Sequence, residues 1–223
     1  MVGPVLADAR RVYARLWTRS VPVAGAVFAV VALAHALADR HPTSGTFLVS
    51  ILLSLVGSLL VQGALVEIVR DLHEGRPPER LGAYTARTRG KLGTLLGATV
   101  LFAFGVAFGL ILLIVPGLIL MARWALIVPL VMIEGRGARE SFGRSTELVR
   151  GRTGQVLAIV VVAAVIAAAG NVLITYLFSG LPNFLAVLLG GAVAGALTVP
   201  YQAQVLTVLY YRLTDPERPV LPA

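Results

Sequence analysis

Long apolar runs separated by short polar and basic segments dominate the pattern of this chain. Six runs almost free of charge extend over residues 21–38, 46–69, 92–115, 118–133, 155–178 and 184–211. Nearly all reach the roughly 20 residues that a helix needs to cross a membrane. The fourth is shorter, but it follows the turn pair Pro116-Gly117 and is interpreted as a span. The pattern predicts an all-α polytopic membrane protein, a bundle of six transmembrane helices forming one domain over residues 1–223.

The composition agrees with lipid as the solvent of most side chains. Of 223 residues, 57% are apolar and 13% are charged, whereas soluble domains average about a quarter charged residues. The chain contains no Cys, which excludes a disulfide-stabilised domain and a Cys-based metal or redox site.

Segments rich in Lys and Arg alternate along the chain with connections that contain almost none. Four lie before the first run, six in 70–91, five in 134–154 and two, Arg212 and Arg218, in the tail; the intervening connections hold only Arg40. Cytoplasmic segments of membrane proteins carry the excess of Lys and Arg. The sequence therefore predicts a multi-pass protein of a prokaryotic plasma (inner) membrane with both termini cytoplasmic. This placement accounts for the net charge of +8 without a nucleic-acid partner.

A cleavable signal peptide is an alternative interpretation of the first run. A basic stretch, an apolar run and the small-residue sequence Ala34-His35-Ala36 imitate one. The first 20 residues are long for such a basic region and have their own amphipathic pattern, which favours an uncleaved span.

Three basic segments on the predicted cytoplasmic side are amphipathic. Residues 6–19 place Leu6, Tyr13 and Trp17 on one helical face and Asp8 and Arg11 on the other. Such short helices are typical of the headgroup plane. Segments 70–91 and 134–154 show a similar pattern. The candidate contacts to anionic headgroups are Arg11, Arg15, Arg87, Arg89, Lys91, Arg150 and Arg152.

The same three segments allow two interpretations of the whole chain. In one, it contains three parallel repeats of an interfacial helix followed by a transmembrane hairpin, which start near residues 6, 79 and 138. In the other, these are the ordinary short basic loops of a polytopic protein. The sequence leaves both open.

Arg123 is the one Lys or Arg inside a predicted span, and ionisable residues in spans are candidates for function. At 1.5 Å per residue it lies roughly 9 Å from Gly117, in the outer half of the membrane. Its guanidinium is expected to reach the outer headgroups beside Trp124, to pair with Asn171, or to hold an anionic ligand. Glu134, at the inner surface, is expected to pair with Arg144 or another base of the amphipathic helix in segment 134–154, or to accept hydrogen bonds from the free N–H groups of that helix.

Proline and glycine positions add expectations about helix packing. Pro129 and Pro200 lie inside the fourth and sixth runs and are expected to kink them. Pairs of glycines at a spacing of four allow helix backbones to approach closely in lipid. These pairs are Gly93/Gly97, Gly105/Gly109 and Gly191/Gly195.

Residues 116–157 resemble a known family signature. A Pro-Gly turn precedes an Arg, a Pro and a Glu on one span, and an Arg-Ser pair and a Gly-Arg entry to the next span follow. The matching residues are Pro116, Gly117, Arg123, Pro129, Glu134, Arg144, Ser145, Gly151 and Arg152. The segment is similar to the membrane domain of some bacterial glycerophosphoryl diester phosphodiesterases and to YciC-like inner-membrane proteins. The resemblance implies six spans but no phosphodiesterase activity, because in those enzymes a separate soluble barrel carries out catalysis.

The sequence contains no recognisable catalytic motif. We therefore expect a non-enzymatic membrane protein without a cofactor or bound metal. Its expected role is to organise or sense lipid, or to assist a membrane complex with a partner protein or a second copy of itself. The alternative is a transporter or channel for a small or amphipathic anion that uses Arg123 as its binding charge.

Overall fold

The computed structural model describes residues 2–77 and 79–217; Arg218, one of the two tail bases, lies outside them. This part is predominantly helical and contains no strand, which confirms the all-α prediction. The long elements are α1 (Val2–Arg40), α2 (Ser44–Glu74), α3 (Leu81–Leu112), α7 (Thr153–Phe178) and α9 (Gly191–Thr214). The shorter α-helices are α4 (Ile114–Arg123), α5 (Ile127–Pro129), α6 (Ala138–Val149) and α8 (Asn183–Leu185), and two π-helices are η1 (Leu130–Glu134) and η2 (Ala186–Gly190).

Six helical segments of the described chain are long and apolar enough to cross a membrane. They are Val2–Arg40, Ser44–Glu74, Leu81–Leu112, Ile114–Glu134, Thr153–Phe178 and Asn183–Thr214. Each of the six predicted apolar runs overlaps one of these segments, but the helices that contain the first and third runs begin 19 and 11 residues earlier than the runs do. The chain is therefore a multi-pass membrane protein.

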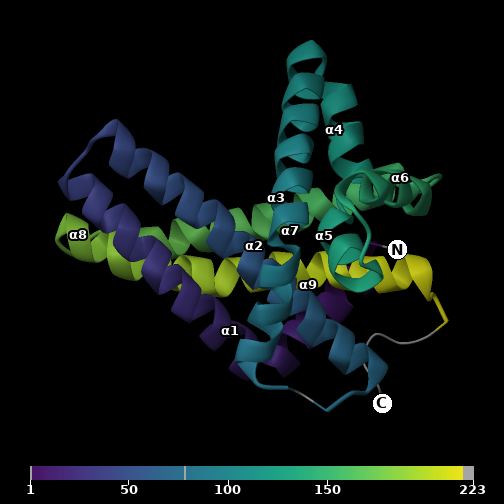
Figure 1. The fold of residues 1–223 in the computed structure, drawn as a ribbon, viewed down its shortest axis with the longest axis horizontal. Coiled ribbons are helices and arrows are strands. Elements are labelled where there is room, and N and C mark those ends of the chain that lie inside the picture. The colour runs from purple at the N-terminus through teal and green to yellow at the C-terminus, as the bar shows by residue number, and fades with distance from the viewer. Residues whose placement is uncertain (1, 78, 218–223) are drawn as a thin grey trace.

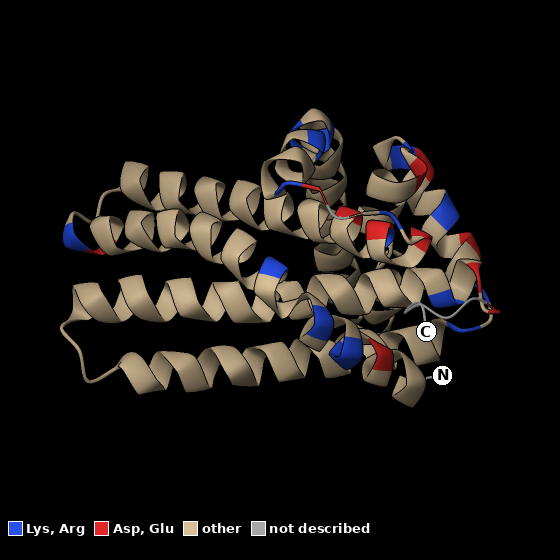
Figure 2. Ribbon diagram, turned by 90° about the horizontal axis from the view of Figure 1, so that it is seen from below, with Lys and Arg blue, Asp and Glu red and all other residues tan. Residues whose placement is uncertain are grey.

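The long helices form three hairpins that fan out from one end of the molecule (Figure 1). The hairpins are α1–α2, α3–α4 and α7–α9, and the α3–α4 hairpin rises steeply away from α7 and α9. Figure 2 shows that most charged residues gather at the end where α1 begins and α9 ends. We call this end the charged end.

The amphipathic segments are only partly separate helices. Residues 6–19 belong to the continuous α1, and residues 81–91 are the first turns of α3; α6 is a helix of its own. The expected division of residues 6–19 is wrong at Asp8. This residue, placed on the polar face, is buried. The start of α1 packs against α9 instead of lying alone in the headgroup plane, because Asp8 has an ion-pair partner there in Arg212.

Pro129 has the expected effect, and the helix breaks upstream of it. α4 ends at Arg123, and three residues in turns separate it from α5. A proline ring collides with the carbonyl of the residue four positions earlier and removes one backbone donor, which explains a break at this place. By contrast, α9 continues through Pro200.

Two of the three glycine pairs lie at close helix contacts. A side chain at Gly109 would meet the backbone of Gly117 on α4, and one at Gly105 would meet the ring of Trp124. In α9, Gly195 faces Phe28 of α1. Gly93 and Gly97 have open space around them, so this pair does not mediate helix packing within the described chain.

Candidate functional site

Ser145 of α6 forms hydrogen bonds with the backbone on both sides of the break between α4 and α5. Its hydroxyl donates a hydrogen bond to the carbonyl oxygen of Arg123 at 2.6 Å and accepts one from the backbone N–H of Leu126 at 3.3 Å. Because the break leaves both backbone groups without helical partners, this one side chain satisfies the two sides of the interruption. The Arg-Ser motif thus connects α6 to the break.

Glu134, at the end of η1, lies in a small polar cluster. Its carboxylate accepts a hydrogen bond from the hydroxyl of Tyr210 at 3.0 Å, forms an ion pair with Arg136, and lies 3.7 Å from Nε of Arg144. The expected pairing with Arg144 is therefore present. Lys91 contacts the same π-helix, since its ammonium group donates to the carbonyl oxygen of Met132 at 2.7 Å.

The expected pairing of Arg123 with Asn171 is absent. The side chain of Arg123 is exposed and forms no hydrogen bond or ion pair with residues 2–77 or 79–217. Asn171 lines a cavity that Arg123 does not line. Trp124 packs against Phe142 of α6, with ring centroids 4.8 Å apart. The carbonyl of Arg123 contacts α6 near the charged end because the helix breaks at this point.

A cavity of about 320 Å³ opens between α1, α2 and the start of α3. Three guanidinium-bearing residues line it, namely Arg15, Arg19 and Arg76. Its one carboxylate, Asp71, accepts a hydrogen bond from the hydroxyl of Tyr84 at 2.7 Å and lies 3.8 Å from Nη1 of Arg76. We call this space the arginine cavity.

Arg19 is the cation of the arginine cavity that has no counter-charge in the described chain. Its side chain is half-buried and forms no hydrogen bond or ion pair with the described residues. The lining therefore has an excess of positive charge that the protein itself does not neutralise. A guanidinium group is suited to a phosphate because its planar donors bind two oxygens at once.

The predicted headgroup contacts separate into two groups. Arg11 pairs with Asp8, Arg87 pairs with Glu79, and Lys91 is held by Met132. Three other residues are exposed and have no ion pair or hydrogen bond within the described segments: Arg89, Arg150 and Arg152. Arg15 lines the arginine cavity.

Arg19 and Arg76 were missed as candidates for contact with anions. Arg19 stood on the polar face of residues 6–19, and this was the signal that could have identified it. For Arg76 the sequence offered only its place in a basic loop. The packing of α1 against α2 brings both residues to one cavity.

Comparison with known proteins gives a family for most of the helical domain. Neither the curated proteins nor the solved structures include a match to this chain. A family pattern matches residues 81–213, which extend from the first residue of α3 nearly to the end of α9 and include Arg123, Glu134 and Ser145. Because this match covers more than half of the sequence, the chain belongs to the family described as a domain of unknown function, DUF7847.

Proposed function

We propose that the protein is a non-enzymatic membrane protein that binds anionic lipid headgroups at the cytoplasmic face of a prokaryotic plasma membrane. The arginine cavity carries this proposal, because its lining has an excess of positive charge. The charged end is assigned to the cytoplasm by its excess of Lys and Arg. The resemblance of residues 116–157 to membrane domains of the phosphodiesterase and YciC-like type supports a role without catalysis.

The membrane itself favours this interaction. The cytoplasmic leaflet has a negative surface potential, and each Lys or Arg near it contributes about 1 kcal/mol of attraction. Arg89, Arg150 and Arg152 are exposed and can add this general attraction. Arg19, half-buried in a cavity, can add a specific contact with one phosphate group.

The experiment compares lipid retention by variants of equal charge. The full chain is purified in nanodiscs of phosphatidylcholine with a minor share of phosphatidylglycerol, and native mass spectrometry counts the lipids that remain bound. Arg19→Gln should lose one tightly held phosphatidylglycerol. Arg123→Gln removes the same charge from an exposed site outside the cavity and should keep it.

Two results contradict the proposal. One is equal retention of phosphatidylcholine and phosphatidylglycerol by the unmodified protein. The other is unchanged phosphatidylglycerol retention in the combined variant Arg19→Gln, Arg89→Gln, Arg150→Gln and Arg152→Gln, provided that this variant remains helical by circular dichroism.

A further inference from the structure

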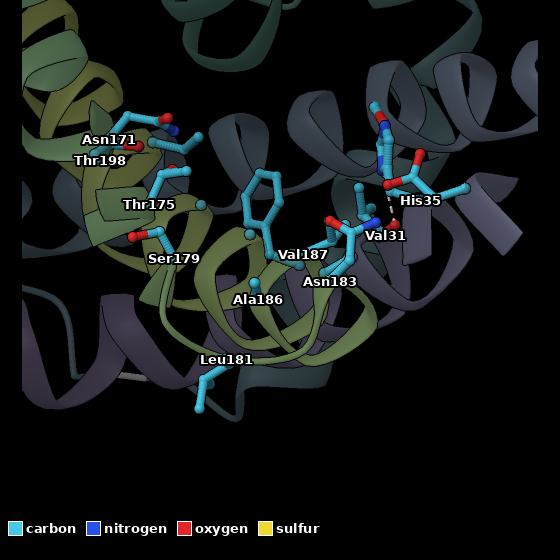
Figure 3. A pocket seen from close by; sticks show the side chains of 17 residues that line it. Val31, His35, Asn171, Thr175, Ser179, Leu181, Asn183, Ala186, Val187 and Thr198 are labelled. Carbon is cyan, nitrogen blue, oxygen red and sulfur yellow. Dashed lines mark hydrogen bonds between the residues drawn. The ribbon is translucent and has the colours of Figure 1, made fainter. Parts of the chain in front are cut away.

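A second and larger cavity lies between the α1–α2 and α7–α9 hairpins, away from the charged end (Figure 3). Its volume is about 760 Å³, which is in the range of sites that hold a small ligand. One wall carries Asn171, Thr175 and Ser179 of the α7 region, and the other carries His35 of α1 and Asn183 of α8 (Figure 3). We call this space the outer cavity.

Some polar groups of the outer cavity already have partners in the protein. The two ring nitrogens of His35 lie 2.9 Å from the carbonyl oxygen of Val31 and 3.4 Å from the hydroxyl of Ser54. The hydroxyl of Thr198 donates to the carbonyl oxygen of Ala194 at 2.7 Å. These groups need no ligand.

Four other polar side chains of the lining have no partner in the described part of the chain. They are Asp39, Asn171, Thr175 and Asn183, and all are accessible. Asn171 and Thr175 lie one helical turn apart in α7, which is otherwise almost entirely apolar. Polar residues in spans often mark a ligand path. Their convergence on one cavity indicates a polar ligand.

The lining also determines the charge that such a ligand should have. It contains the carboxylate of Asp39 and no Lys or Arg. Asp39 forms no ion pair with the described residues, although Arg40 is its neighbour, because Arg40 lies over the ring of Phe184 at 3.9 Å. A phosphate or carboxylate would therefore meet a like charge here, whereas an ammonium group would meet an opposite one.

The remaining lining is apolar and extends along the cavity. Here α1 contributes Phe28, Val31 and Ala32, and α9 contributes Gly191, Gly195 and Val199; the two helices are in direct contact at Phe28–Gly195 and Ala32–Gly191. Ala186 and Val187, in the π-helix η2, add to the wall. Such π-helical turns occur frequently at binding sites. This part of the cavity suits a hydrocarbon chain.

We propose that the outer cavity binds an amphiphile with an ammonium headgroup, whose charge lies at Asp39 and whose hydrocarbon chain extends toward Phe28. Asn171, Thr175 and Asn183 bind the polar atoms between the headgroup and the chain. This proposal does not depend on lipid binding in the arginine cavity, because the two cavities have no lining residue in common.

The test measures binding of dodecylammonium to the full chain in a neutral maltoside detergent by isothermal titration calorimetry, with dodecyl phosphate as the anionic counterpart. Dodecylammonium should bind more tightly than dodecyl phosphate. Asp39→Asn should lower the affinity for dodecylammonium about tenfold, since a charge-assisted contact is lost. Glu140→Gln removes one exposed negative charge from α6 and should leave the affinity unchanged.

A second variant tests the cavity independently of charge. Ala186→Leu adds volume to the wall of the cavity and leaves the net charge unchanged. It should weaken the binding of dodecylammonium by a similar factor. Unchanged affinity in both Asp39→Asn and Ala186→Leu, or binding of dodecyl phosphate as tight as that of dodecylammonium, would overturn the proposal.

A separate experiment distinguishes whether the ligand is a membrane lipid or a soluble amine. The protein is placed in nanodiscs that contain phosphatidylethanolamine and phosphatidylcholine. The ammonium group of phosphatidylethanolamine carries N–H donors, whereas that of phosphatidylcholine is fully methylated. Preferential, Asp39-dependent retention of phosphatidylethanolamine identifies a membrane lipid as the ligand. Asp39-dependent binding of dodecylammonium alone identifies a soluble amphiphilic amine.

Discussion

The carboxylate of Asp8 on α1 accepts a hydrogen bond from Nε of Arg212 on α9 at 3.0 Å, and so joins the two ends of the chain at the charged end. Asp8 is buried, and Arg11 also donates to it. The pair lies between the two helices that form the longest common interface of the bundle. Its acid and base therefore fix the axial position of α1 relative to α9.

Asp8→Asn should lower the free energy of unfolding by about 1–3 kcal/mol, because it leaves Arg212 near a neutral side chain. Asp39→Asn is the matched control, since it changes the same residue type on the same helix at an exposed site without a partner. Thermal unfolding in detergent measures both. Equal stability of the two variants would contradict the importance of the Asp8–Arg212 contact.

Ser145→Ala should loosen the break between α4 and α5. The substitution removes the partners of the Arg123 carbonyl and the Leu126 N–H, at a cost of about 1–3 kcal/mol. Hydrogen exchange at the amide of Leu126 should become faster. Thr146→Ala serves as control because that hydroxyl bonds only within α6, to the carbonyl oxygen of Phe142. Unaltered exchange in Ser145→Ala would show that the serine does not hold the break.

Gly195→Val should destabilise the bundle by roughly 1–3 kcal/mol, because the added side chain meets the ring of Phe28 on α1. Gly93→Ala, in open space on α3, should be neutral or stabilising, since alanine favours a helix over glycine by about 1 kcal/mol. The two apparent melting temperatures should move in opposite directions. A Gly195→Val protein as stable as Gly93→Ala would contradict the close α1–α9 contact.

Arg123→Gln should change neither stability nor lipid retention by much, because its guanidinium is exposed and has no protein partner in the described segments. This variant also tests the alternative function. If the protein were an anion transporter that binds its substrate at Arg123, anion flux into proteoliposomes would exist and would be lost in Arg123→Gln. We expect no flux that depends on this residue.

Features that depend on local sequence were predictable. The six spans follow from run length, because a membrane requires a minimum number of apolar residues. The Glu134–Arg144 contact could be expected because the two residues are close along the chain. The break before Pro129 follows from the covalent structure of proline.

Features that depend on distant packing were not predictable. Asp8 has the periodicity of a surface residue, but its partner Arg212 lies 204 positions away. Arg123 was assigned a depth from an unbroken helix, whereas Ser145 holds a break directly after it. The outer cavity combines residues of several helices, and single polar residues such as Asn171 and Thr175 do not indicate which residues of other helices line the same cavity.

The unbroken length of α1 has a mechanical consequence. Arg15 and Arg19, near the middle of α1, line the arginine cavity, and His35 and Asp39, near its C-terminal end, line the outer cavity. The helix is continuous over 39 residues and includes Pro22 between these two pairs. If occupancy of one cavity moves α1, it changes the shape and therefore the affinity of the other, and thermodynamic reciprocity makes this coupling equal in both directions. α1 is thus a direct structural connection between the two cavities.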